Sequence, residues 1–188
     1  MRSLVFYSLA LLGLCEAAIY GNAQNELTSL IPLGNGTICS NPRPNSCTFY
    51  SQCLEAQEQC GPNGYPIGYG LHYCTLFINV RSEMSESGQA WITNTMLCLQ
   101  RDLIQYGTGA KSTTCAGLKE YAFGTHPRCY VDNGVCKLPP SDWVIVVKTI
   151  SLRELFGSWD ALKQVLETAD GCAEFYSWLI ENEVSSMS

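Results

Sequence analysis

The sequence predicts a single all-α domain cross-linked by disulfides. Three observations support this: ten cysteines behind an apolar leader, apolar residues at helical spacing, and turn signals between the periodic segments. Hydrophobic residues make up 46% of the chain and charged residues 15%, a composition that can form a packed core. Without the leader about 165 residues remain, which suits one domain.

The cysteines after the leader are even in number, and none belongs to a CxxC pair. Such a set predicts a disulfide framework, because oxidised cysteine persists outside the reducing cytosol. We therefore expect a secreted, extracellular protein. The cysteines are Cys39, Cys47, Cys53, Cys60, Cys74, Cys98, Cys115, Cys129, Cys136 and Cys172.

Residues 1–23 have the pattern of a signal peptide, with cleavage expected after Ala17 or Ala23. Arg2 supplies a positive charge, and residues 4–14 form an apolar run of about a dozen residues, short of the roughly 20 that span a bilayer. Nothing later in the chain predicts a membrane span. Cys15 is expected to leave with the leader.

The formal charge is −6, and the chain has no basic run. This argues against nucleic acid or an anionic membrane as the partner. We expect an extracellular protein partner instead.

Residues 24–46 are polar and rich in proline and glycine, which predicts a flexible N-terminal arm. The arm contains Asn35-Gly36-Thr37, an acceptor sequence for N-glycosylation. Residues 47–184 are expected to form the disulfide-linked helical domain.

Helices are expected over residues 48–60 and 67–84, separated by the break Gly61-Pro62-Asn63-Gly64. Ser85-Glu86-Ser87 marks the next start. The residues that follow at steps of four and three place one apolar stripe on a helix: Ile92, Met96, Leu99, Leu103 and Tyr106. Gly107 and Gly109 end this segment.

Ser112 or Thr113 is expected to cap a helix that runs to Phe123 and stops at Gly124. Residues 143–149 could form a helix or a buried strand, and we favour helix because a proline and a Ser-Asp cap precede them. Shorter segments at 151–156 and 158–168 precede a last helix that ends at Glu183.

The last helix carries Phe175, Tyr176 and Trp178 on more than one face. Since one core cannot bury all three, we expect them to be candidates for the surface of a reversible dimer. The expected state is a monomer or a non-covalent dimer.

The two histidines, His72 and His126, each lie near a cysteine. Together with Cys74 and Cys129 they could form a zinc site. The alternative is that both cysteines are in disulfides and both histidines are surface or cap residues. In the secreted context we favour the second interpretation, so we expect no metal and no cofactor.

A second alternative is a small secreted hydrolase that uses His72. The stretch from Gly68 to Cys74 loosely resembles the histidine- and cysteine-bearing helix of small secreted phospholipases. Their adjacent His-Asp pair and glycine-rich calcium loop are absent, so we expect no catalytic residue and no enzyme. In the same region Tyr65, Tyr69, Tyr73 and Phe77 recur every four positions, a spacing typical of core packing.

From Cys74 to Cys172 the gaps between successive cysteines are 23, 16, 13, 6 and 35 residues. This spacing resembles that of the stanniocalcins, a family of secreted glycoprotein hormones. The segment Ser87-Gly-Gln-Ala-Trp-Ile-Thr-Asn-Thr-Met-Leu-Cys98 is also similar to that family.

The resemblance implies five disulfides: Cys39–Cys53, Cys47–Cys74, Cys60–Cys115, Cys98–Cys129 and Cys136–Cys172. Two features differ from the family pattern. Stanniocalcins usually carry an eleventh cysteine in a longer C-terminal tail, which links two chains. Their glycan also lies between early cysteines, whereas Asn35 precedes Cys39.

The resemblance implies a stanniocalcin-like helical fold and a non-enzymatic regulator of calcium and phosphate handling. Some members of the family inhibit secreted metalloproteases of the pappalysin type. A rival interpretation is a secreted, cysteine-rich effector or defence protein that binds another target.

Overall fold

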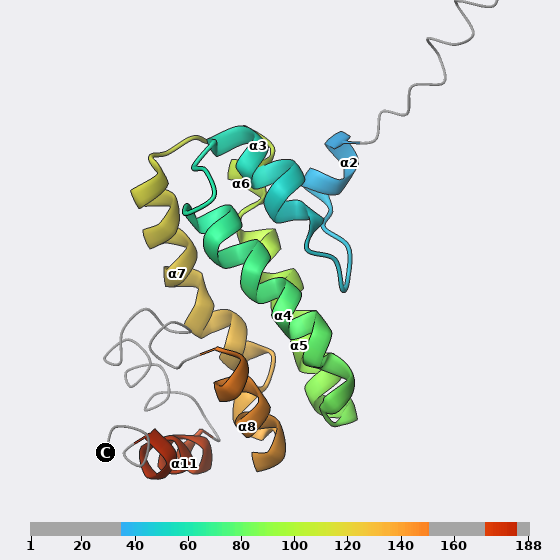
Figure 1. Ribbon diagram of the computed structural model, residues 1–188, viewed down its shortest axis with the longest axis vertical. Coiled ribbons are helices and arrows are strands. Elements are labelled where there is room, and N and C mark those ends of the chain that lie inside the picture. Colours follow the sequence, from blue (N-terminus) through green and yellow to red (C-terminus); the bar gives the residue numbers. More distant parts are fainter. Residues whose placement is uncertain (1–34, 151–171, 184–188) are drawn as a thin grey trace, which may run out of the picture. The chain divides into compact units, whose positions relative to one another are not determined.

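The computed structural model describes residues 35–150 and 172–183, and every regular element in these ranges is helical (Figure 1). This confirms the disulfide-bonded, all-α class. The signal peptide and the segments expected at 151–156 and 158–168 lie outside the described residues. Of the helices in the described ranges, none has the length and apolar character needed to cross a membrane.

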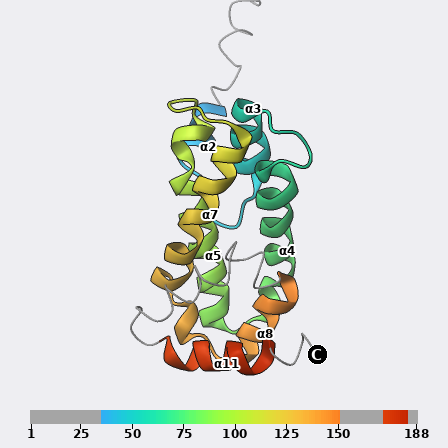
Figure 2. The ribbon, with the colours of Figure 1, turned by 90° about the vertical axis from the view of Figure 1, so that its left-hand side faces the viewer.

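Three helices run side by side (Figures 1 and 2), and each contributes residues to the core. They are α4 (His72–Val80), α5 (Glu86–Asp102) and α7 (Cys115–Asp132). The π-helical segment η2 (Tyr65–Leu71) leads into α4, and the 3-10 turn η3 (Arg81–Glu83) leaves it. Ser85 caps α5 by accepting a hydrogen bond from the Gly88 amide, as its sequence predicts.

Shorter elements cover the end of this group where α7 begins. They are α2 (Asn35–Ser40), η1 (Tyr50–Leu54), α3 (Glu55–Glu58) and α6 (Ile104–Gly107). The segment expected as a flexible arm is thus helical over residues 35–40. The Cys39–Cys53 disulfide ties this short helix to η1.

At the other end lie η4 (Val135–Lys137), α8 (Pro140–Thr149) and α11 (Ala173–Glu183). Residues 143–149 are helical, so the strand alternative is wrong. Figure 2 shows α11 running crosswise at the end where α8 begins. The ring of Trp143 lies 4.9 Å from that of Phe175 and 5.5 Å from that of Trp178.

Phe175 is not available for a dimer surface, because it is 1% exposed. The sequence-based expectation for this residue was wrong, since the contact with Trp143 on α8 buries it. Trp178 is half-buried against the same core.

The apolar stripe predicted from Ile92 to Tyr106 faces the core, which confirms the prediction. Leu103 is fully buried, and no member of the stripe is more than 9% exposed. The stripe packs with residues of α4 and α7, so the apolar area removed from water is shared between all three helices.

The predicted end of α7 at Gly124 was wrong, because the helix continues to Asp132. A Cβ at Gly124 would meet nothing within 4 Å, so this glycine is an exposed interior position. The chain leaves the helix at Gly134, whose φ of +94° is the left-handed conformation that glycine adopts readily. The N-cap is Thr114 and not Ser112 or Thr113, and its side chain accepts from the Gly117 amide at 3.1 Å.

Candidate functional site

The row Tyr65, Tyr69, Tyr73 and Phe77 lines the interior between η2, α4 and the neighbouring helices. Tyr65 is 4% exposed and Phe77 9%, while the other two are half-buried. The rings of Tyr65 and Tyr69 stack at 5.5 Å, and those of Tyr69 and Tyr73 lie 4.7 Å apart. The row is therefore part of the core, as its spacing predicts.

His126 lies among these rings, although the sequence predicted a surface or cap residue. It is 1% exposed, with Nε2 3.1 Å from the Tyr65 hydroxyl and Nδ1 3.3 Å from the Tyr130 hydroxyl. In a neutral imidazole one nitrogen donates and the other accepts, so the two hydroxyls take opposite roles. Burial raises the pKa of Tyr65 and of Tyr130 well above 10, which keeps both hydroxyls protonated.

A small cavity of about 40 Å³ lies beside this group. Its lining includes Trp91, Met96, Thr95, His126 and Tyr130. The hydroxyl of Thr95 is buried and has no hydrogen-bond partner. The volume admits one or two water molecules, whereas drug-sized ligands need pockets of roughly 300 Å³ or more. We therefore do not interpret the cavity as a ligand pocket.

The zinc alternative required free thiolates at Cys74 and Cys129. Both cysteines are in disulfides, so they cannot supply them. The buried nitrogens of His126 are also taken up by tyrosine hydroxyls. This alternative is therefore wrong.

His72 is exposed on α4, and its ring lies 4.8 Å from that of Tyr73. Within residues 35–150 and 172–183, no carboxylate is hydrogen-bonded to it. A general base normally needs such an orienting partner. The described part of the chain thus gives the hydrolase alternative no further support.

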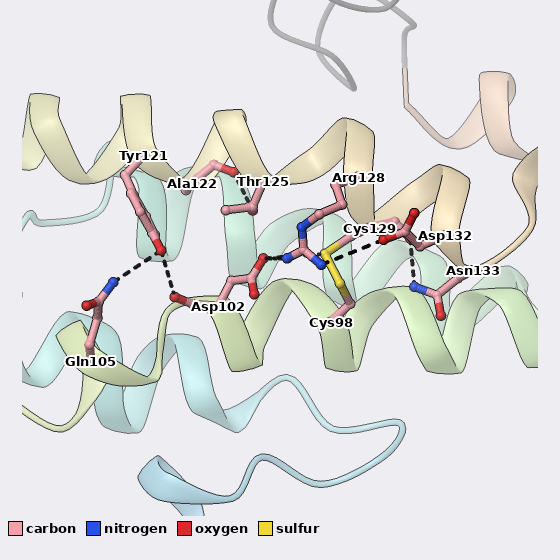
Figure 3. A network of polar contacts seen from close by, with 10 residues as sticks. All are labelled: Cys98, Asp102, Gln105, Tyr121, Ala122, Thr125, Arg128, Cys129, Asp132 and Asn133. Atoms are coloured by element: carbon pink, nitrogen blue, oxygen red, sulfur yellow. Dashed lines mark hydrogen bonds and ion pairs between the residues drawn. A yellow bond between two sulfur atoms is a disulfide. The ribbon is translucent and has the colours of Figure 1, made fainter. Parts of the chain in front are cut away.

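A polar network joins α5 to α7 on the surface (Figure 3). Arg128 pairs with Asp102 on α5 and lies 3.8 Å from Asp132 one turn along its own helix. The Tyr121 hydroxyl accepts from Gln105 at 3.1 Å. Because the arginine on α7 pairs with Asp102 on α5, we interpret the network as a clamp between the two helices.

The sulfurs of Cys98 and Cys129 lie beside Asp102, and three such side chains can bind a metal in other proteins. Here the two sulfurs are bonded to each other, and the carboxylate is paired with Arg128. Neither is a free ligand, so we assign no metal to this cluster.

Five disulfides cross-link the chain between residues 39 and 172. They are Cys39–Cys53, Cys47–Cys74, Cys60–Cys115, Cys98–Cys129 and Cys136–Cys172. These are the pairs that the resemblance to stanniocalcins implies. Their number suggests an extracellular or otherwise oxidising compartment.

Asn35 is the first residue of α2. Two groups that organise the structure were not found from the sequence, namely the Tyr65–His126–Tyr130 group and the buried carboxylate of Asp142. The spacing of His126 and Tyr130, one helical turn apart, was the only local signal for the first. No local signal exists for the second, because its partner is Ser85 on another helix.

The comparisons with known proteins add no identification. No protein-family model matches the chain, and neither do the curated proteins or the solved structures.

Proposed function

We propose that this chain is a secreted, non-enzymatic, stanniocalcin-like glycoprotein that acts as a hormone-like regulator through protein binding. The observation that carries the proposal is the set of five disulfides, which has the pairing implied by the resemblance. Five cross-links over one helical unit give a rigid scaffold on which an extracellular binding surface can be held.

The binding role is favoured by the character of the interior. The aromatic row, His126 and four of the five disulfides contribute buried residues to the core, and the cavity among them is too small for a substrate of ordinary size. The partner is an extracellular protein. By the resemblance it is either a receptor in calcium or phosphate handling or a secreted metalloprotease.

The test begins with the full chain expressed in a eukaryotic secretory host and purified from the medium. Proteins of extracellular fluid that bind the immobilised chain are identified, and inhibition of a pappalysin-type metalloprotease is measured directly. The control is the same protein after reduction and alkylation, which has the same composition without the scaffold. Saturable binding or inhibition that is lost in the control supports the proposal.

Two results would contradict it. Retention of the chain inside the cell with reduced cysteines would exclude a secreted regulator. Turnover of an ester or lipid substrate that His72→Ala abolishes would favour the hydrolase. If the captured protein belongs to another organism, the effector or defence interpretation is correct.

The glycoprotein part of the proposal has its own measurement. Enzymatic removal of N-glycans should lower the mass of the secreted chain by one glycan. The variant Asn35→Gln should have the lower mass from the start. An unchanged mass after the enzyme would show that Asn35 is not modified.

A further inference from the structure

The Cys60–Cys115 disulfide differs from the other four in its exposure. In each of the others at least one cysteine is 5% exposed or less. Cys115 is exposed and Cys60 is half-buried, so this is the one disulfide of the five without a buried cysteine. An attacking thiolate needs access to a sulfur, and Cys115 is the one exposed cysteine among the ten in disulfides.

The residues that precede Cys115 in the sequence are also exposed to solvent. Every residue from 108 to 116 is exposed, and Leu118 is the first fully buried residue of α7. On the opposite side the disulfide meets the end of α3, where Gln59 is also exposed. The reagent therefore meets loop residues and not the core.

The position of Cys115 also favours the chemistry. It is the first residue of α7, an 18-residue helix whose N-cap is Thr114. The positive end of a helix stabilises a thiolate, so Cys115 can be released as a thiolate once its bond has been exchanged. The exposure of the disulfide and the position on the helix are independent observations that lead to the same site.

We propose that the Cys60–Cys115 disulfide is a site of thiol–disulfide exchange with an external dithiol. In the first step one thiolate of the dithiol attacks the sulfur of Cys115. The Cys60–Cys115 bond breaks, and Cys60 leaves as a thiolate and takes up a proton. In the second step the second thiolate of the reagent attacks the reagent sulfur that is bonded to Cys115 in the mixed disulfide. Cys115 is released, and the reagent becomes a disulfide.

The balance is two electrons and two protons transferred from the dithiol to the two cysteines. The consequence is local, because the other four disulfides remain. A hydrogen bond then still joins the exposed loop to α3 in the described residues. The Thr113 amide donates it to Glu58 Oε2 at 3.4 Å. Reduction thus removes the covalent link between the end of α3 and the first turn of α7, while the core stays packed. This inference does not depend on the proposed function.

The test uses the secreted full chain and dithiothreitol as the dithiol. Native protein is exposed to graded concentrations, the new thiols are alkylated, and the labelled peptides are quantified by mass spectrometry. We expect Cys60 and Cys115 to be labelled together, at a rate at least about tenfold above that of any other cysteine. Earlier labelling of another pair, or simultaneous labelling of all ten cysteines, would overturn the proposal.

A matched variant replaces both residues, Cys60→Ser with Cys115→Ser. It should show no labelling at the dithiothreitol concentration that reduces the native pair. Labelling of other cysteines at that concentration would show that the lability is general and would contradict the proposal. Hydrogen exchange on the native chain, alkylated only at this pair, gives a second readout that does not need the variant to fold. Faster exchange confined to residues 55–64 and 108–118 is expected, and global loss of protection would contradict it.

Discussion

Gly88 stands where any side chain would collide with a buried carboxylate. A Cβ at this position would lie 2.9 Å from both Asp142 Cγ and Met84 Cβ. Asp142 is 1% exposed and accepts from the Ser85 amide at 3.0 Å and from the Ser85 hydroxyl. The absence of a side chain at one residue therefore lets a carboxylate from α8 cap the start of α5.

The variant Gly88→Ala should lower the free energy of unfolding by about 1–3 kcal/mol, because the carboxylate must move from its hydrogen bonds. Urea titration of the secreted protein measures it. The control is Gly124→Ala, also within a helix, where the added methyl group meets nothing within 4 Å. That change should raise the free energy of unfolding by about 0.5–1 kcal/mol. Equal effects of the two variants would refute the contact at Gly88.

Three buried tyrosines predict a loss of stability in base. Burial raises the pKa of Tyr50, Tyr65 and Tyr130 above the ordinary value of 10.0. In the folded protein they stay protonated, while in the unfolded chain they ionise near pH 10. Since the unfolded state then binds fewer protons, the stability present below pH 10 is lost as the pH rises. Three such groups lower the free energy of unfolding by about 4 kcal/mol per pH unit once the unfolded chain is ionised.

Absorbance of tyrosinate measures this directly. The three buried tyrosines should ionise only together with the loss of helical circular dichroism. If all three buried tyrosines ionise while the helical signal is unchanged, their hydroxyls are accessible to solvent and the prediction is wrong.

At the scale of the element, α7 shows where sequence patterns succeed and where they do not. The periodic stripe from Ile92 to Tyr106 could be predicted from its spacing, although α5 ends at Asp102 and Tyr106 lies on α6. The length of α7 could not be predicted, because both Gly124 and Gly134 are local stop signals. What distinguishes them is tertiary structure: Cys98–Cys129 and the Arg128–Asp102 pair hold α7 against α5 beyond Gly124. Pro127 lies inside the helix, where it removes one backbone hydrogen bond.

The start of α7 gives a prediction that separates two neighbouring threonines. Thr114→Ala removes the acceptor of the Gly117 amide and should cost about 1 kcal/mol in the free energy of unfolding. Thr113→Ala is the matched control, since this residue is exposed and lies one position before the cap. It should change stability by less than about 0.5 kcal/mol. Thermal unfolding of both variants tests it, and a larger effect at Thr113 would place the cap where the sequence alone predicted it.

At the scale of the molecule, the cross-links and the cavity differ in what the sequence could reveal. Cysteine spacing can be read from the sequence, so the resemblance in spacing was enough to imply the disulfide pairing. The cavity could not be predicted, because η2, α4, α5 and α7 each contribute only part of its wall. Likewise, Phe175 on α11 packs against Trp143 on α8, which is far away in the sequence. Patterns along one segment give the elements, while contacts between segments decide the site.

The last prediction concerns covalent assembly of the whole molecule. All ten cysteines between residues 39 and 172 are in intrachain disulfides, whose Cα–Cα distances lie between 4.7 and 5.8 Å. These distances lie in the normal range for disulfides, so each cysteine meets its partner within the chain at far higher effective concentration than any cysteine of a second chain. We therefore predict a monomer, or a dimer held only by surface contacts.

Non-reducing electrophoresis of the secreted protein should show a single-chain band, and alkylation under denaturing, non-reducing conditions should label nothing. One labelled thiol per chain would identify Cys15 as retained, since the other ten pair off. A dimer band that collapses with reductant has a different meaning. It would require either Cys15 or an exchanged Cys115 to bridge two chains. Two variants distinguish these routes: Cys15→Ser alone, and Cys60→Ser combined with Cys115→Ser. The dimer band should disappear only in the variant that lacks the bridging cysteine.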